Sequence, residues 1–200
     1  NLPITQAILV QVRLVQTLGQ ALQRHTNQLR DALIRSYPAA LGIFGKLTSQ
    51  ITLHFLMAYP TEKHAQSLTR DAFDLFCRQH HYTRTDLLSR CYANLMEPMP
   101  KPNPATSQAY ENLVRTLAQI LLPLVRFRTK AIAELQDLFH QHPDAEIFLS
   151  LPGAGDFLAP ALLAKFGDHR DRFPTPNSVQ ALTATCPVTK KSGKRKVVLF

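Results

Sequence analysis

Cysteine is scarce in this sequence, and long apolar runs are missing. The three cysteines, Cys77, Cys91 and Cys186, are an odd and scattered set. They do not form the framework of a disulfide-stapled secreted domain, and they favour a reducing cytosol. No apolar run approaches the roughly 18 residues that a transmembrane helix needs, and no signal peptide opens the chain. We therefore expect a cytoplasmic protein with no membrane partner.

Acidic residues are missing from the C-terminal end. From Arg172 to Phe200 there are six Lys and Arg and no Asp or Glu, whereas the whole chain carries a net charge of +9. Such a concentrated cationic patch favours a polyanionic partner, with nucleic acid as the first candidate. An anionic membrane is the weaker alternative, because no amphipathic helix carries these charges.

Familiar metal-ligand and acid–base patterns are missing too. Cys77, His80, His81 and Cys91 have a spacing that matches no common zinc pattern. The two histidines fall at the end of an expected helix, where cations interact well with the helix dipole. The acids offer no His–carboxylate pair for acid–base work, and they include Asp71, Asp74, Asp156, Asp168 and Asp171. We expect no metal site within this chain.

What the sequence does contain is helical periodicity. Apolar residues recur every seven positions in two long segments, and they predict helices over 5–35 and 107–140. The first series is Ile8, Val15, Leu22 and Leu29; the second is Tyr110, Leu117, Leu124, Ala131 and Leu138, with Leu113, Ile120 and Phe127 offset by three. Pro123 should kink or split the second helix. The two helices can pack on each other or on a second copy of the chain, and the sequence does not decide between these. Because heptad helices commonly associate between chains, we expect a homo-oligomer.

Shorter helices are expected between the long ones. They cover 41–59, 68–80 with Thr69 as N-cap, and 83–95 capped by Thr83 or Thr85, with a turn at 61–63. Four prolines between Glu97 and Pro104 predict a stiff connector. The expected fold is mainly α, with coiled-coil-like helices and a helix-hairpin-helix-like C-terminal domain. Its expected segments are 1–100, a helical linker; 101–145, the long helix; and 146–200, the C-terminal domain.

The stretch from Leu151 to Asp168 joins an apolar lead-in to an apolar helix through a glycine turn. Gly153 and Gly155 at the two ends of the turn permit left-handed backbone angles and close approach of another backbone. Unpaired amides at the start of the next helix suit a phosphate. This layout is typical of a helix-hairpin-helix that contacts nucleic-acid backbone. The alternative is an ordinary corner between two helices.

The segment from residue 190 to 196 places one serine among five cations. Its cations are Lys190, Lys191, Lys194, Arg195 and Lys196, and Ser192-Gly193 is a turn signal. Val188-Thr189 and residues 197–200 flank this turn and are candidate strands of a hairpin, and a helix capped by Asn177 or Ser178 precedes it. The cations are expected to contact DNA with strong salt dependence. They would also stabilise charge if Ser192 attacked a phosphate, although a serine in a basic turn is usually only a turn residue.

These two motifs together resemble a known family. Leu-Pro-Gly-Ala-Gly followed by Ala-Leu-Leu-Ala-Lys-Phe-Gly-Asp-His-Arg-Asp-Arg-Phe, and then Cys-Pro-Val-Thr-Lys-Lys-Ser-Gly-Lys-Arg, is similar to the C-terminal transposase domain of the insertion sequence 110 family (116/110/902 group). A looser similarity extends upstream through Tyr37-Pro38 and Tyr59-Pro60-Thr61. These are transposases of bacterial mobile elements.

The resemblance implies DNA strand cleavage and exchange with Ser192 as the nucleophile. It also implies an upstream RuvC-like domain whose four acids hold the metal, so Mg²⁺ is expected only there. A structured bridge RNA and an oligomeric, nucleoid-associated enzyme are further implications. Because the chain begins at Asn1 and stops after a Val-Val-Leu run, we expect part of a longer protein that is inactive alone. The rival hypothesis is a non-catalytic helix-hairpin-helix module for DNA binding and dimerisation, and charge alone would also suit an RNA-associated structural protein.

Overall fold

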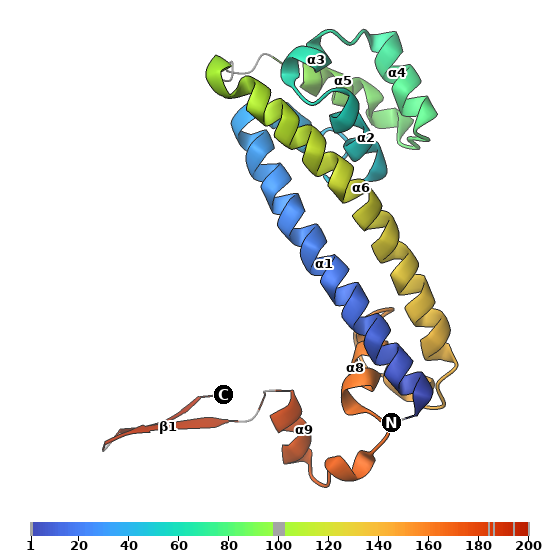
Figure 1. Ribbon diagram of the computed structural model, residues 1–200, viewed down its shortest axis with the longest axis vertical. Coiled ribbons are helices and arrows are strands. Elements are labelled where there is room, and N and C mark those ends of the chain that lie inside the picture. The colour runs from blue at the N-terminus through green and yellow to red at the C-terminus, as the bar shows by residue number, and fades with distance from the viewer. Residues whose placement is uncertain (1, 98–102, 184, 186, 194, 200) are drawn as a thin grey trace. The chain divides into compact units, whose positions relative to one another are not determined.

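The computed structural model describes residues 2–97, 103–183, 185, 187–193 and 195–199 (Figure 1). Within these ranges the chain is mainly helical, as expected, with one pair of strands. It divides into two compact units, each described by itself. The C-terminal unit comprises Asn1–Val12 and Glu134–Phe200, and the central unit is Arg13–Ala133. None of the described helices combines the length and apolar character that a bilayer span requires.

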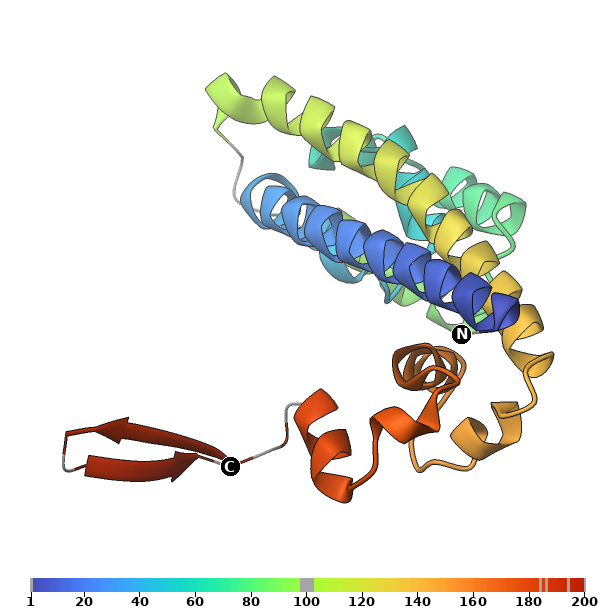
Figure 2. The same cartoon turned by 60° about the horizontal axis from the view of Figure 1, so that its bottom comes forward.

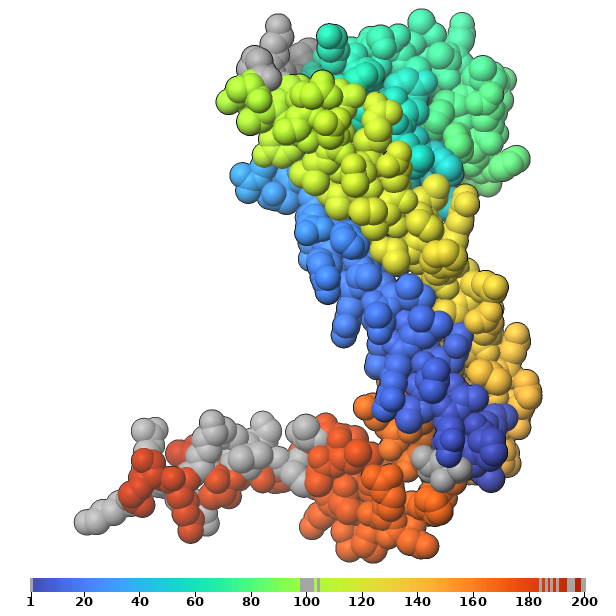
Figure 3. Space-filling model, viewed as in Figure 1, coloured from blue at the N-terminus to red at the C-terminus, as the bar shows by residue number. Residues whose placement is uncertain are grey.

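Two long helices, α1 (Pro3–Ser36) and α6 (Pro104–His140), run side by side in the central unit (Figures 1 and 2). Their buried side chains belong to one core, which includes Leu29 and Leu33 of α1 and Val114, Leu117 and Leu121 of α6. The space-filling view shows the side chains of the two helices meeting (Figure 3). The two helices therefore pack on each other within the chain.

The expected heptad positions divide into buried, half-buried and exposed sets. Ile8, Val15 and Leu29 of α1 are buried, as are Leu117 and Ala131 of α6. The series offset by three positions is not buried. The exposed fractions of Leu113, Ile120 and Phe127 are 43%, 37% and 58%. Its place in α6 is taken by Val114, Ala118 and Leu121, because a helix facing a globular core buries a wider stripe than a coiled-coil seam does.

Pro123 does not split α6, which continues through it to His140. Of the two expected outcomes, a kink or a split, the split is therefore wrong, and the reason is physical. Proline removes the hydrogen bond to the carbonyl four residues earlier, at Gln119. Both Gln119 and Pro123 are exposed, so water can bind the freed carbonyl and the rest of the ladder persists.

The helix expected over 41–59 begins nine residues late. The segment opens with the 3₁₀ turn η1 (Pro38–Gly42) and a glycine at positive φ, Gly45 at 85°. Only then does α2 (Gln50–Ala58) start, with the Ser49 hydroxyl accepting a hydrogen bond from the Thr52 amide at 3.4 Å. The apolar residues before it, including Ile43 and Phe44, are buried as loop residues, so their hydrophobicity was not a helix signal.

Two other expectations for this region need correction, and one is confirmed. The turn at 61–63 is instead the start of a short helix, α3 (Glu62–Gln66), capped by Thr61. Thr69 caps α4 (Arg70–Gln79) as expected, accepting from the Ala72 amide at 3.3 Å. Neither Thr83 nor Thr85 caps α5 (Leu88–Met96), because a 3₁₀ turn, η2 (Thr85–Leu87), precedes it and makes Leu87 the N-cap. The connector at 98–102 lies outside the described residues.

An aromatic cluster holds α2 against α4. Phe55 is fully buried and meets Phe44, Phe76 and Phe73 edge-on, with ring centroids 5.7, 5.6 and 6.5 Å apart. Edge-to-face pairs of this kind add about 0.5–1.5 kcal/mol each beyond the area they bury. The cluster fixes α4, whose C-terminal end precedes the pocket considered below.

The C-terminal unit contains the short helices and the strands. In order they are α7 (Ala145–Leu149), α8 (Leu158–Phe166), the 3₁₀ turn η3 (Arg170–Arg172), α9 (Pro176–Leu182), β1 (Val188–Ser192) and β2 (Arg195–Leu199). The cap of α9 is Thr175, which forms a reciprocal capping box with Ser178. Neither Asn177 nor Ser178 is the N-cap, because Pro176 takes the first helical position, where its missing N–H costs nothing.

Candidate nucleic-acid interface

The basic segment forms a tight antiparallel hairpin. Strands β1 and β2 pair with Ser192 opposite Arg195 and Lys191 opposite Lys196. Gly193 has φ of 57° at the first position of the two-residue loop, where a hairpin of this length requires a left-handed backbone. The expected pair of strands is confirmed. The loop is shorter than the predicted basic turn. Four of the five cations belong to the strands: Lys190, Lys191, Arg195 and Lys196.

Ser192 is the last residue of β1, and its side chain is exposed. A methyl group built on Gly193 would find no atom within 4 Å, so a phosphodiester can approach the loop. Lys191 is exposed as well. Lys194 lies outside the described residues, and of Lys190, Arg195 and Lys196 the structure describes the backbone alone.

The glycine hairpin lies between α7 and α8. Pro152 and Gly153 occupy the centre of a turn in which the Ala154 amide donates to the Leu151 carbonyl at 3.0 Å. Gly153 has φ of 77°, as the third position of a type II turn demands. Gly155 is not left-handed, so the prediction holds for one end of the turn and is wrong for the other. Its amide instead donates to the Gly153 carbonyl at 3.1 Å.

The surface at this hairpin is open. Gly153 and Gly155 are exposed, and a methyl group added to either meets no atom within 4 Å. Among the described residues nothing fills the space that a side chain would take at either position, so this space is free for another molecule. They belong to a different element from the Ser192 hairpin.

A buried polar cluster in the same unit joins residues far apart in the sequence. The Thr5 hydroxyl donates to Asp168 Oδ1 at 2.7 Å, and the Leu2 amide donates to Asp168 Oδ2 at 2.5 Å. His142 Nε2 lies 3.0 Å from Thr5 Oγ1 and 3.3 Å from Asp168 Oδ1. We call Thr5, His142 and Asp168 the buried clasp.

The clasp pairs Asp168, one of the acids near the glycine hairpin, with a histidine, and the sequence pattern did not predict this contact. It does not, however, have the layout of a catalytic triad. His142 Nδ1 accepts from the Asp144 amide at 3.1 Å, so the proton resides on Nε2 and is donated to Thr5 and Asp168. Both ring nitrogens are thus satisfied, and the side chain is 4% exposed. The clasp holds the start of α1 against the loops that follow α6 and α8.

The charge of Asp168 is stabilised where it lies. Burial alone would raise the pKa of this carboxyl, but hydrogen bonds from Thr5, Leu2 and His142 outweigh it and hold the pKa below its ordinary value. Sequence reasoning missed the clasp because Thr5 and Asp168 are 163 positions apart. The one local signal is the position of Asp168 directly after Gly167, which ends α8 at φ of 69°.

The cysteines and histidines considered for zinc have other surroundings. Cys77 and Cys91 are buried, and the Cys91 thiol donates to the Ile43 carbonyl at 2.8 Å. His80 stacks on His54 and contacts Phe76, with centroids 4.6 and 4.3 Å apart. Across the described part of the chain, no three His, Cys, Asp or Glu side chains gather closely enough to hold a metal ion.

Comparison with known proteins finds a family model that matches the C-terminal part of the chain. Residues 145–199 match the model of the transposase IS116/IS110/IS902 family. The matched region opens at the first residue of α7 and ends at the last residue of β2, so it contains both the glycine hairpin and Ser192. Two residues of the clasp, Thr5 and His142, lie outside it.

Two curated relatives from Streptomyces coelicolor extend the similarity over nearly the whole chain. It is 29% identical, over 98% of its own length and 49% of the relative's, to the protein assigned as the mini-circle transposase for IS117. It is 25% identical, over 95% of its length and 47% of the relative's, to an uncharacterized 43.6 kDa protein of insertion element IS110. The chain thus spans about half the length of these relatives. No solved structure matches it.

Proposed function

We propose that this chain is the serine-bearing part of a DNA transposase. The observation that carries the proposal is the exposed Ser192 at the end of β1, beside a glycine loop with open space around it and within the family-matched region. The Ser192 oxygen attacks a DNA phosphorus and forms an O–P bond, while the bond from phosphorus to a sugar oxygen breaks. The hydroxyl proton leaves with that oxygen. The covalent link keeps the phosphodiester energy, so a second DNA hydroxyl can reverse the step and complete strand exchange.

The DNA backbone is held by charge in this proposal. Six Lys and Arg and no acids from Arg172 to Phe200 provide a binding term that is independent of base sequence and falls steeply with salt. Gly153 and Gly155 provide a second, uncharged approach to the backbone. A protein acting in this way works on the bacterial chromosome in the cytoplasm.

Ser192 needs a partner outside this chain. None of the described residues forms a hydrogen bond with its hydroxyl, and an isolated serine is a poor nucleophile. We propose that a RuvC-like domain in the other half of the transposase holds Mg²⁺ and activates the reaction. The described residues of this chain include no group of three His, Cys, Asp or Glu side chains that could hold the metal. On this view the chain alone binds DNA but does not cut it.

Two further partners belong to the proposal. A structured bridge RNA would select the DNA, and a second copy of the chain would pack on the exposed stripe Leu113, Ile120 and Phe127 of α6. These residues recur every seven positions, as a seam between helices requires. Phe127→Glu should convert a dimer into a monomer in light scattering, whereas Gln108→Glu on the same helix should not. A dimer that survives Phe127→Glu rejects this stripe as the seam.

The decisive experiment measures the covalent intermediate. The complete transposase that contains this chain is incubated with its DNA, and adducts are counted by denaturing electrophoresis. Ser192→Ala should abolish the adduct, and Thr189→Ala, which removes a hydroxyl from the same strand, should preserve it. An undiminished amount of adduct in Ser192→Ala would show that Ser192 is not the nucleophile. If the wild type binds DNA and never forms an adduct, the rival module for DNA binding and dimerisation is correct.

A further inference from the structure

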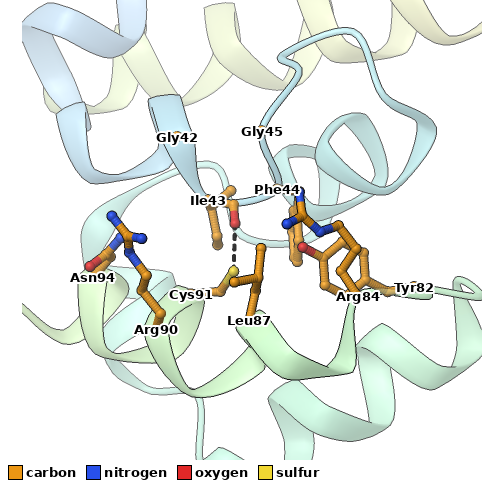
Figure 4. Close-up of a pocket in the computed structure, with 10 residues that line it drawn as sticks. All are labelled: Gly42, Ile43, Phe44, Gly45, Tyr82, Arg84, Leu87, Arg90, Cys91 and Asn94. Carbon is orange, nitrogen blue, oxygen red and sulfur yellow. Dashed lines mark hydrogen bonds between the residues drawn. The ribbon is translucent and has the colours of Figure 1, made fainter.

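The central unit contains a pocket that the proposed chemistry does not use. It has a volume of about 210 Å³ and opens between the loop after η1 and the face of η2 and α5 (Figure 4). Gly42 and Gly45 line the loop side, and Arg84, Arg90 and Asn94 line the opposite side. No Asp or Glu is among the lining residues.

The loop wall of the pocket exposes backbone at Gly42 and Gly45, beside the side chains of Ile43 and Phe44. The hydrogen bond from the Cys91 thiol to the Ile43 carbonyl ties the loop to α5 (Figure 4). Gly45 adopts φ of 85°, and neither Gly42 nor Gly45 would place a methyl group within 4 Å of another atom. A ligand can therefore approach main-chain groups directly, as phosphate-binding loops allow.

The pocket is strongly cationic. Burial raises the pKa of the Cys91 thiol, while a hydrogen bond with Tyr82 and the charges of Arg90 and Arg84 lower it. The guanidinium groups of Arg84 and Arg90 therefore both influence the thiol of Cys91, which lines the pocket. Both side chains are exposed, and within the described ranges no carboxylate forms an ion pair with either. Two unneutralised guanidinium groups beside a glycine wall suit a phosphate.

The remaining wall is formed by the aromatic ring of Tyr82 and the side-chain amide of Asn94. Tyr82 is partly buried, its ring meets Phe44 edge-on at 5.2 Å, and its hydroxyl points toward the pocket (Figure 4). Asn94 offers both a donor and an acceptor. The volume of about 210 Å³ is below the range of about 300–1,000 Å³ that is usual for small-molecule pockets, so there is room for no more than one nucleotide. A nucleotide that leaves its stack meets just such a combination of cation, ring and amide in single-strand binding proteins.

We propose that this pocket binds one unpaired nucleotide of a single-stranded nucleic acid, with Arg84 and Arg90 on its phosphate and Tyr82 and Asn94 beside its base. The site goes beyond the proposed function, because it requires neither Ser192 nor a cut strand. Its lining residues all lie in the central unit, outside the family-matched region.

The test is the salt dependence of binding by the chain. Fluorescence anisotropy with labelled dT12, U12 and a 12-base-pair duplex compares the wild type with Arg84→Gln/Arg90→Gln. The slope of log K against log salt for a single strand changes by about 0.7 for each phosphate that is neutralised, and Arg84 and Arg90 share one phosphate here. Between 50 and 200 mM salt, the wild type should therefore lose about 2.6-fold more single-strand affinity than the double variant. Duplex binding should be unchanged.

Controls separate the pocket from net charge and from the serine chemistry. Arg13→Gln/Arg24→Gln removes two exposed arginines from α1 and should leave the single-strand slope within about 0.3 of the wild type. The readout is the salt dependence of binding and not adduct formation, so this test can succeed when the adduct test fails. Unfolding temperatures verify the fold of each variant. Equal slopes for wild type and Arg84→Gln/Arg90→Gln, an equal change in the α1 control, or a loss confined to the duplex would overturn the proposal. The stronger of the dT12 and U12 effects identifies the strand as DNA or RNA.

Discussion

Removing the charge of Asp168 should destabilise the C-terminal unit measurably. The carboxylate accepts from Thr5, Leu2 and His142 at 2.7, 2.5 and 3.3 Å. A hydrogen bond to a charged group contributes about 1 kcal/mol more than one between neutral groups. Three such bonds give about 3 kcal/mol, which we reduce to about 2 kcal/mol because the third is long and the side chain is part-exposed. Asp168→Asn should therefore lower the midpoint of thermal unfolding by about 4–8 °C.

The pH dependence of this loss has a definite sign. Because the folded-state pKa of Asp168 is depressed, its carboxylate contributes stability above the unfolded-state pKa of about 3.9 and loses that contribution as pH falls through the folded-state value. The gap in unfolding temperature between wild type and Asp168→Asn should be full at pH 7 and shrink below about pH 4.

The assay is circular dichroism with a matched control. Asp171→Asn removes an exposed carboxylate three residues further on, and it should shift the midpoint by less than about 1 °C. Hydrogen exchange should rise in residues 2–12 and 140–168 of Asp168→Asn. A gap below about 1 °C at pH 7, or one that stays constant down to pH 2.5, would refute an ionised, hydrogen-bonded Asp168.

Three further predictions concern the central unit. Tyr37→Phe should raise the free energy of unfolding by about 1 kcal/mol, because the buried Tyr37 hydroxyl has no hydrogen-bond partner among the described residues; a loss in denaturant titration would reveal a bound water. His81→Gly should raise the free energy of unfolding by up to about 1 kcal/mol, because His81 has φ of 52° just after α4 and a left-handed backbone angle favours glycine. His81→Ala keeps the Cβ and should give no such gain in calorimetry. Burial raises the pKa of Cys77 to about 12, so alkylation at pH 8 followed by mass spectrometry should modify it only after unfolding, and rapid labelling of the folded chain would contradict its burial.

The long helices were predictable because their signals are local and repeated. Apolar residues at helical spacing from Ile8 to Leu29 and from Tyr110 to Leu138 predict α1 and α6 almost to their ends. The N-cap at Thr69 follows from a side chain that bonds within its own turn. Where a chain offers several candidate caps, as at Thr83 and Thr85, the choice depends on packing, and sequence reasoning fails.

The site was predictable only in part for a related reason. Ser192-Gly193 is a turn signal between β-branched residues, and the hairpin forms there. Pro152-Gly153 likewise predicts its own turn, but Gly155 adopts an ordinary backbone angle because the turn needs only one left-handed residue. The pocket beside Arg84 and Arg90 has no signature in the sequence, since a loop before α2 forms its other wall.

The clasp also constrains the order in which the chain folds during synthesis. Thr5 leaves the ribosome 163 residues before Asp168, which at 5–20 residues per second is an interval of about 8–33 s. For that time the first residues of α1 have no partner from the far end of the chain, and contacts so distant in sequence close slowly. The C-terminal unit is therefore completed only after Asp168 has emerged, and premature termination before Asp168 should leave the first residues of α1 open to proteolysis.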